Sequence, residues 1–272
     1  MLIVDSRLDG GKAFDWGRTA ADYAKYRDIY PEVFYQKIAD RGLCVSGQSV
    51  LDLGTGTGVL PRHMYRYGAR WTGVDISPEQ IEEAGKLSRE AGMDIAYQAV
   101  SAEEMDFPPA SFDVITACQC FWYFDHERIA PKLAALLKED GRLLLLYMAW
   151  LPREDALAGM SEDLVLRYSP NWSGAGETRH PIEVPEAVLK YFQLEDHEVY
   201  DCLVPFTRET WHGRMRACRG VGASLSGEAL AAWDKEHREL LAARAPERFD
   251  VLHYVATAIL SNVSDKRSIP SK

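Results

Sequence analysis

Three glycines and one aspartate form the clearest chemical pattern in the chain. The largely apolar run Val-Leu-Asp-Leu at 50–53 leads into Gly54, Gly56 and Gly58, and Asp75 follows 21 positions after Gly54. Glycines in a turn permit positive φ torsions and let a ligand approach the backbone, because they carry no Cβ. A carboxylate at this distance beyond the turn can accept hydrogen bonds from ribose hydroxyls. The spacing predicts a site for an adenosyl cofactor beside the start of a helix.

Two other nucleotide-binding motifs fit this turn less well. The dinucleotide fingerprint has its third glycine three residues after the second, whereas Gly58 follows Gly56 by two. A P-loop requires a Gly-Lys pair followed by Ser or Thr, and the turn lacks it. The turn therefore disfavours an NAD enzyme and excludes a P-loop nucleotidase.

The elements that must position these residues alternate along the chain. Strands are predicted over residues 50–53, 71–75, 95–100, 112–117 and 142–148, with helices over 59–64, 77–91 and 127–138. The aliphatic run in 142–148 is typical of a strand buried on both faces of a parallel sheet. Beyond residue 150 we expect turns over 151–181, a helix over 184–192, a strand over 197–205, helices over 207–245 with a break at 220–227, and a strand over 249–260. Alternation of this kind predicts a doubly wound α/β fold.

The motifs of the first two strands resemble those of a known family. The residues from Asp52 to Gly58 and from Gly73 to Ser77 are similar to the cofactor site of class I S-adenosylmethionine (SAM) methyltransferases. The resemblance implies SAM as cofactor, S-adenosylhomocysteine as product, and a Rossmann-like seven-stranded sheet, mostly parallel, with a C-terminal antiparallel hairpin and a helical cap. The cofactor residues that it implies are Tyr23, Arg27, Asp52, Gly54, Thr55, Gly56, Gly58, Asp75, Ile76, Ser101, Ala102, Glu103 and Gln119.

Within this set, the turn after the third strand departs from the family. Ser101 stands where the family often has an aspartate that helps to hold the adenine. Two alternatives stay open for Glu103: it substitutes for that carboxylate, or it faces solvent and the backbone alone makes the contacts.

The segment before the first strand resembles the entry segment of the trans-aconitate-type methyltransferases. In that group an aromatic residue and an arginine face the methionine end of SAM, and Tyr23 and Arg27 match them. An arginine suits a carboxylate because it can form two parallel hydrogen bonds with it. Asp28 stands where that group usually has proline. Residues 14–45 are therefore predicted either as a lid over the cofactor or as helices that only pack on the sheet.

An aromatic run follows the fourth strand, where ligands bind in open α/β sheets. It is similar to the Gln-x-Phe-His-Trp-Phe-Asp run of the trans-aconitate-type group, with Trp122 and Tyr123 in place of His-Trp. We expect Trp122 and Tyr123 to bind substrate together with three residues of the cap, Tyr168, Trp172 and Arg179. The alternative is that the cap residues form the cap's own small core. No catalytic residue stands out from the sequence.

Composition limits the partners that we expect. The net charge of −10 disfavours general affinity for nucleic acid or anionic membranes, and no apolar run reaches transmembrane length. We expect a cytoplasmic protein whose five cysteines are free thiols and which binds no metal. A homodimer is compatible with the sequence. Residues 1–13 are expected to form a mobile or locally docked arm, and the last ten residues to be frayed.

These observations predict SAM-dependent methyl transfer to a small organic molecule, with an oxygen, such as that of a carboxylate, as first choice of acceptor. Residues 1–272 are interpreted as one domain, with cap insertions at 151–181 and 207–245. Two alternatives stay open: a protein that binds SAM without catalysis, and a methyltransferase that acts on a protein.

Overall fold

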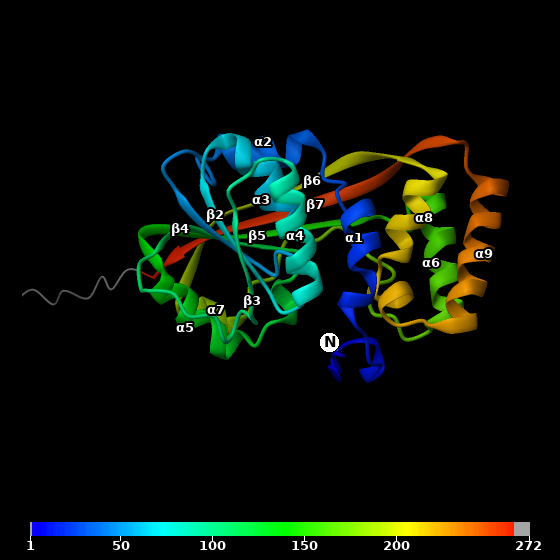
Figure 1. Cartoon of the computed structure of the whole chain (residues 1–272), viewed down its shortest axis with the longest axis horizontal. Helices are drawn as coiled ribbons and strands as arrows, with labels where there is room; N and C mark the ends of the chain where they lie inside the picture. The colour runs from blue at the N-terminus through cyan, green and yellow to red at the C-terminus, as the bar shows by residue number, and fades with distance from the viewer. Residues whose placement is uncertain (1, 264–272) are drawn as a thin grey trace, which may run out of the picture.

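The computed structural model describes residues 2–263 and is built on one seven-stranded sheet (Figure 1). The strands lie in the order β3-β2-β1-β4-β5-β7-β6. Their bounds are β1 Ser49–Leu53, β2 Arg70–Asp75, β3 Ala96–Ala99, β4 Phe112–Cys118, β5 Leu137–Trp150, β6 Phe192–Thr207 and β7 Arg248–Asn262. The first five strands pair in parallel, and β7 pairs antiparallel with both β5 and β6. The predicted fold class, including the closing antiparallel hairpin, is confirmed.

Alternate residues of the central strands pack on opposite faces of the sheet. Leu143 and Leu145 of β5 join one apolar cluster, with Leu133 of the helix α5, while Leu144 and Leu146 join the other. All four are almost completely buried. Burial on both faces explains why the sequence of β5 is a continuous aliphatic run and does not alternate with polar residues.

The helices begin where side chains can cap them. Ser77 accepts from Gln80 N–H at the start of α4, and Asp125 accepts from Arg128 N–H at the start of α5. The α-helices are α1 Ala20–Tyr26, α2 Glu32–Asp40, α3 Val59–Met64, α4 Pro78–Glu90, α5 His126–Leu136, α6 Ala156–Tyr168, α7 Glu186–Leu189, α8 Arg208–Arg216 and α9 Gly227–Arg244. Short 3₁₀ turns are η1 Asp9–Gly11, η2 Trp16–Thr19, η3 Tyr65–Tyr67 and η4 Phe121–Tyr123, and η5 Arg219–Ala223 is a π-helical turn.

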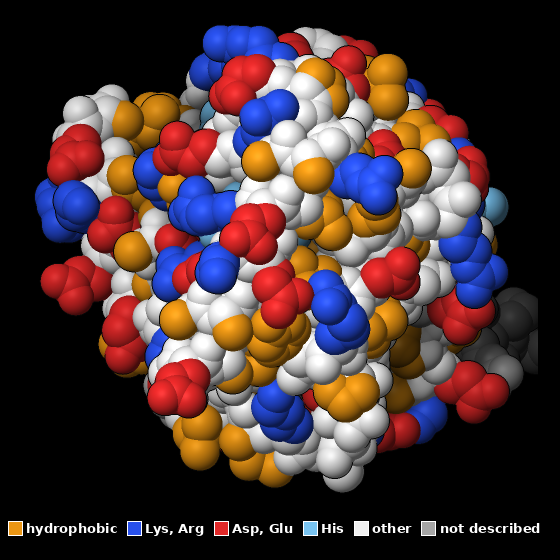
Figure 2. Space-filling model, turned by 90° about the vertical axis from the view of Figure 1, so that its right-hand side faces the viewer, with side chains coloured by type: hydrophobic (Ala, Val, Ile, Leu, Met, Phe, Trp, Pro, Cys, Tyr) orange, Lys and Arg blue, Asp and Glu red, His pale blue; other side chains and the backbone are white. Residues whose placement is uncertain are grey.

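A group of helices stands beside the sheet at one end of the molecule (Figure 1). We call α6, α8, η5 and α9 the cap; α1 packs against α8 between the cap and the sheet. The long hairpin of β6 and β7 reaches toward this end, and the chain between its two strands forms α8, η5 and α9. Figure 2 looks onto this end and shows acidic and basic side chains interspersed over it.

Three sequence predictions about local structure require correction. Residues 156–168, expected as turns, form α6, because Asp155 caps the N–H groups of Leu157 and Ala158. The helix expected over 184–192 contains only α7, and β6 already begins at Phe192, which pairs with Asn262. The helix expected to continue to residue 138 ends at Leu136, because Leu137 pairs with Phe112 in the sheet.

The N-terminal arm is docked. Ile3 and Phe14 form an isolated antiparallel bridge, and Asp9 is buried against the cap. The frayed end expected for residues 263–272 falls, from residue 264 on, outside the described residues. Within residues 2–263, no helix combines the length and the apolar character that crossing a membrane requires.

Candidate active site

One cavity of about 620 Å³ joins the carboxyl ends of the sheet strands to the cap and the arm. A volume of this size is typical of sites for small organic ligands. The cavity wall contains residues from the glycine turn, from the ends of β2 and β4, from α1, from the arm and from the cap. Elements far apart in the sequence therefore share this single space.

The glycine turn after β1 contributes two of its three glycines to the cavity wall. Gly54, Gly56 and Gly58 all have positive φ, at 56°, 56° and 73°. Gly54 and Gly56 line the cavity. A Cβ on Gly58 would instead lie 2.3 Å from the hydroxyl of Tyr97, which packs beside it. Gly58 therefore makes room for a side chain of the protein and does not line the cavity.

Asp75 lies at the end of β2 with its carboxylate held by two backbone groups. Oδ2 accepts the Gly56 N–H at 2.8 Å, and Oδ1 accepts the Ser77 N–H at 2.9 Å. Burial raises the pKa of Asp75, and these backbone hydrogen bonds oppose the rise. Each oxygen keeps a lone pair for a further donor, so the carboxylate is fixed where a ligand diol can reach it.

The side chains of Asp52, at the end of β1, and of Thr55, within the turn, are buried and lie outside the cavity wall. The Asp52 side chain is buried and accepts a hydrogen bond from the Thr116 hydroxyl at 2.6 Å. Burial raises the pKa of Asp52 to about 7. These two residues, predicted to touch the cofactor, therefore do not line the cavity.

The loops after β3 and β4 bring the other expected cofactor residues to the cavity. Ile76, Ser101, Ala102, Glu103 and Gln119 all line it. The Glu103 carboxylate accepts the Asp125 N–H at 3.0 Å, so this side chain is tied to the loop before α5. Gln119 has a positive φ of 66° and donates its side-chain N–H to the Met148 carbonyl.

Tyr23 and Arg27 also line the cavity, from α1 and its C-terminal end. The Tyr23 ring lies against Gly56, and the Arg27 guanidinium lies 4.6 Å from the centre of that ring. Arg27 Nη2 donates to the Tyr23 hydroxyl at 3.2 Å. The N-terminal segment therefore contacts the glycine turn directly.

Of the five predicted substrate residues, three line the cavity. Trp122 and Tyr123 do so from η4, and Trp172 does so from the loop after α6. The rings of Trp122 and Tyr147 are in edge-to-face contact, with 4.8 Å between the ring centres. Trp172 also packs on Gly220, where a Cβ would lie 2.6 Å from its ring.

Tyr168 and Arg179 are not brought to the cavity. The Tyr168 hydroxyl donates to Glu236 at 2.6 Å within the cap. Arg179 forms ion pairs with Asp201, at 2.6 Å, and with Glu154 at the surface. Carboxylates of the protein already occupy this guanidinium, which corrects the expectation that Arg179 binds substrate.

The sequence analysis missed several residues of the cavity wall. Arg214, Arg219 and Glu177 line it, as do arm residues such as Leu2 and Val4. Glu177 accepts hydrogen bonds from Tyr147 at 2.5 Å and Tyr254 at 2.9 Å. These side chains come from segments without a motif, so the sequence held no signal for them beyond the presence of charge in the cap.

Two cysteines, Cys118 and Cys120, contribute thiols to the cavity. Both line the cavity, and all five cysteines of the chain are free. Burial raises the pKa of Cys118 to about 12 and that of Cys120 well above its usual value. A thiol in this state is a poor nucleophile at neutral pH. Within residues 2–263, no three His, Cys, Asp or Glu side chains are grouped to hold a metal ion.

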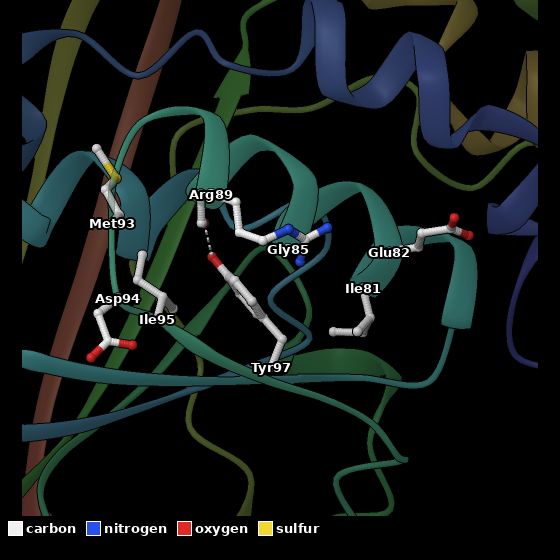
Figure 3. Close-up of a pocket in the computed structure, with 9 residues that line it drawn as sticks. Ile81, Glu82, Gly85, Arg89, Met93, Asp94, Ile95 and Tyr97 are labelled. Carbon is white, nitrogen blue, oxygen red and sulfur yellow. Dashed lines mark hydrogen bonds between the residues drawn. The ribbon is translucent and has the colours of Figure 1, made fainter.

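A second hollow, of about 510 Å³, lies between α4 and β3 (Figure 3). Its wall includes Ile81, Met93 and Ile95, and the Tyr97 hydroxyl points to Ser88, to which it is hydrogen-bonded at 3.0 Å. The wall contains none of the predicted site residues.

Comparison with known proteins agrees with this geometry. The profile of the methyltransferase domain family matches residues 51–145. A ubiquinone biosynthesis O-methyltransferase of Xanthomonas campestris pv. campestris (strain B100) is 30% identical over 178 residues, which cover 64% of this chain and 72% of the relative. Its counterpart in Xanthomonas euvesicatoria pv. vesicatoria is 34% identical over 128 residues, 46% of this chain, and the match spans only about half (54%) of that relative.

A solved structure supports the fold alone. A candidate methyltransferase from Bacillus halodurans C-125 superposes with a TM-score of 0.52 at 16% identity, covering 83% of this chain and 97% of the other.

Proposed function

The chain belongs to the SAM-dependent methyltransferases, and on this premise we propose that it transfers a methyl group from SAM to an oxygen of a small organic molecule. One observation carries the proposal: a single cavity contains both the glycine turn with Asp75 and a wall of aromatic side chains from η4, the end of β5 and the loop after α6. The relatives named O-methyltransferases support oxygen as the acceptor atom.

The residues around the turn fit the cofactor. Gly54 and Gly56 leave the backbone open, and Asp75 holds its carboxylate ready for two hydroxyls. Ser101 to Glu103 would hold the adenine, and Arg27 the carboxylate of SAM. When bound, SAM supplies a methyl group activated by its sulfonium.

The protein's own part is then to position the acceptor and exclude water. The arm, η4 and the cap enclose the aromatic half of the cavity. Glu177 lines the cavity and accepts hydrogen bonds from Tyr147 and Tyr254, and its carboxylate can accept a proton from a hydroxyl acceptor. A carboxylate acceptor needs no such step, and it remains our first choice of acceptor group.

The features of the surface support a small acceptor over a nucleic acid. The net charge is −10, and the face in Figure 2 mixes both signs of charge without a broad basic area. Nucleic-acid sites need clustered positive charge to neutralise phosphates.

Titration calorimetry with SAM and S-adenosylhomocysteine, followed by methyl-transfer assays, tests the proposal. Acids, phenols and amines serve as small acceptors, and a cell extract serves as a source of protein acceptors. We expect SAM binding and transfer to a small molecule. Binding without transfer to any acceptor would favour a non-catalytic binder, and labelling of proteins alone would favour a protein methyltransferase. Absence of SAM binding would contradict the proposal altogether.

A further inference from the structure

Three arginines line the cavity, and only one of them has a counter-ion within the described chain. Arg219 is paired with Asp9, with Nε 2.7 Å from Oδ2, and both side chains are buried. Arg27 and Arg214 form no ion pair with any acidic side chain in residues 2–263. Since the three guanidiniums share one cavity, Arg219 is the reference for a buried arginine whose charge is paired.

Of the two arginines without an ion pair, Arg214 is the one that also has a buried N–H group without a hydrogen-bond partner among the described residues. Its side chain is 4% exposed and extends from α8 over the ring of Trp150, 4.7 Å from the ring centre. Nη1 contacts the Cys218 sulfur at 3.2 Å, and Nε has no hydrogen-bond partner among the described residues. Burial, with the nearby charge of Arg27, lowers the pKa of Arg214 to about 10, so it is still charged at neutral pH.

The acidic side chains of the cavity wall are engaged elsewhere. Asp5 is paired with Arg7, Asp75 accepts backbone N–H groups, and Glu103 accepts the Asp125 N–H. Glu177 contacts two tyrosine hydroxyls and His180. A buried charge without a partner is costly, and chains seldom retain one without a use. The missing negative charge must therefore come from a ligand.

SAM by itself does not supply enough negative charge. It carries one carboxylate, which Arg27 beside the glycine turn is proposed to bind, and its sulfonium adds a positive charge to the same cavity. Arg214 stands on the cap side, stacked on Trp150 at the end of β5, and its Nε donor has no hydrogen-bond partner among the described residues. A guanidinium of this kind matches a carboxylate with two parallel hydrogen bonds.

We infer that Arg214 is a specificity-determining residue that binds a carboxylate of the acceptor, so that the acceptor is a small organic acid. The inference rests on the proposed function, because it assigns an acceptor to the same cavity. It places the acid group beside the Arg214 guanidinium that packs on Trp150, and the aromatic residues of η4 provide the apolar wall.

Binding measurements with matched probes test this assignment. Benzoate and benzamide, and 3,4-dihydroxybenzoate and its amide, are titrated into the protein with and without S-adenosylhomocysteine. We expect each acid to bind more tightly than its amide, and Arg214→Met to weaken acid binding by about ten- to a hundredfold while amide binding is unchanged. Arg214→Lys should retain part of the preference, because it keeps the charge but not the planar fork. The inference is overturned if no acid is preferred, or if the preference survives in Arg214→Met.

A second measurement distinguishes the two possible sources of the carboxylate, the acceptor and SAM. The affinity of Arg214→Met for SAM should be close to that of the native protein. If SAM binding falls and acid binding does not, Arg214 serves the cofactor and the acceptor assignment is wrong. If the native protein does not bind SAM at all, the proposed function fails, whereas the comparison of acids with amides on the ligand-free protein still gives its own answer.

Thermal melts of the ligand-free protein provide a readout that does not depend on any acceptor. Arg214→Met removes a charge without a partner, so the Tm should be unchanged or higher. Arg219→Met is the matched control: it leaves Asp9 buried without its partner, and the Tm should fall. A fall in Arg214→Met as large as that in Arg219→Met would mean that the charge of Arg214 is compensated within the protein, and would overturn the inference.

Discussion

Two parts of the cavity are built by different means: the part around the glycine turn and Asp75, where we propose that SAM binds (the donor half), and the part around η4, Arg214 and Arg219, where we propose that the acceptor binds (the acceptor half). Around the glycine turn, backbone groups hold the functional side chain: both oxygens of Asp75 accept N–H groups from residues at most 19 positions away. On the cap side, side chains hold one another, as in the pair of Asp9 with Arg219, 210 positions apart. A site held by local backbone geometry leaves a motif in the sequence, whereas a site held by distant side-chain pairs does not.

The largest expected effect comes from lowering the pH, which changes the stability contributed by buried groups in the two halves in opposite directions. Burial lowers the pKa of His212 to about 4, and those of His237 and His253 to about 3, at the cap end of the molecule. The contribution of these neutral histidines to the free energy of unfolding is fully present above pH 6.5. It is lost as the pH falls toward 4, by about 1.4 kcal/mol per pH unit for each histidine. Asp52 opposes them: its raised pKa contributes stability at low pH that is lost as the pH rises toward 7.

Urea unfolding at pH 7, 6 and 5 checks this balance. We expect the free energy of unfolding to fall as the pH falls, with a shallower slope in His237→Gln and a steeper one in Asp52→Asn. In Asp52→Asn, where the opposing carboxylate is absent, a free energy of unfolding that is constant from pH 7 to 5 would show that these histidines are not buried in the neutral form.

The next effect concerns the pair that ties the arm to the cap. Asp9→Ala leaves the buried Arg219 guanidinium without its partner, so we expect a loss of about 3–5 kcal/mol in the free energy of unfolding. Asp5→Ala is the control, because it removes an exposed pair with Arg7 and should cost less than about 1 kcal/mol. Chemical denaturation measures both variants. Equal losses would contradict a structural difference between the two pairs.

A smaller effect is expected from the donor half, and on binding more than on stability. Asp75→Ala removes hydrogen bonds to the cofactor hydroxyls worth on the order of 1.5–3 kcal/mol, so SAM should bind about ten- to a hundredfold more weakly. The variant should still melt cooperatively. Asp94→Ala, at an exposed position beside the second hollow, is the matched control for loss of an acid. Unchanged affinity in Asp75→Ala would contradict the cofactor assignment.

The smallest effect distinguishes Trp122, which lies in the cavity wall, from Arg179, which lies at the surface. Trp122→Ala should lower turnover with SAM affinity retained, because Trp122 lines the acceptor half. Arg179→Ala should change neither quantity, because its guanidinium is paired with Glu154 and Asp201 outside the cavity. Steady-state kinetics with calorimetry checks both. Lost turnover in Arg179→Ala would return this residue to the acceptor site.

The sequence could predict the sheet and the donor half because their signals are local. Alternating apolar strands, the glycines and Asp75 each depend on residues nearby in the chain, and the fold class that they predicted is confirmed. The helix α6 was missed although the sequence carries its signals: Asp155 is an N-cap residue, and Ala158 and Val165, two helical turns apart, both face the core. Arg214 and Glu177 could not be predicted, since their importance depends on which charges are absent around them in space. Arg179 was proposed from charge alone, and its pairing with Asp201 could be seen only once β6 was in place.

The register of the closing hairpin has a consequence for how such a protein can change. Thr207 and Arg248 are paired on the adjacent strands β6 and β7, so the 40 residues between them leave the sheet and return to it at the same pair of residues. That stretch contains Arg214 and Arg219 but no residue of the glycine turn. A different insert between these two positions would therefore change the part of the cavity wall that contains Arg214 and Arg219, where we propose that the acceptor binds, while the pairing of the sheet strands stays the same.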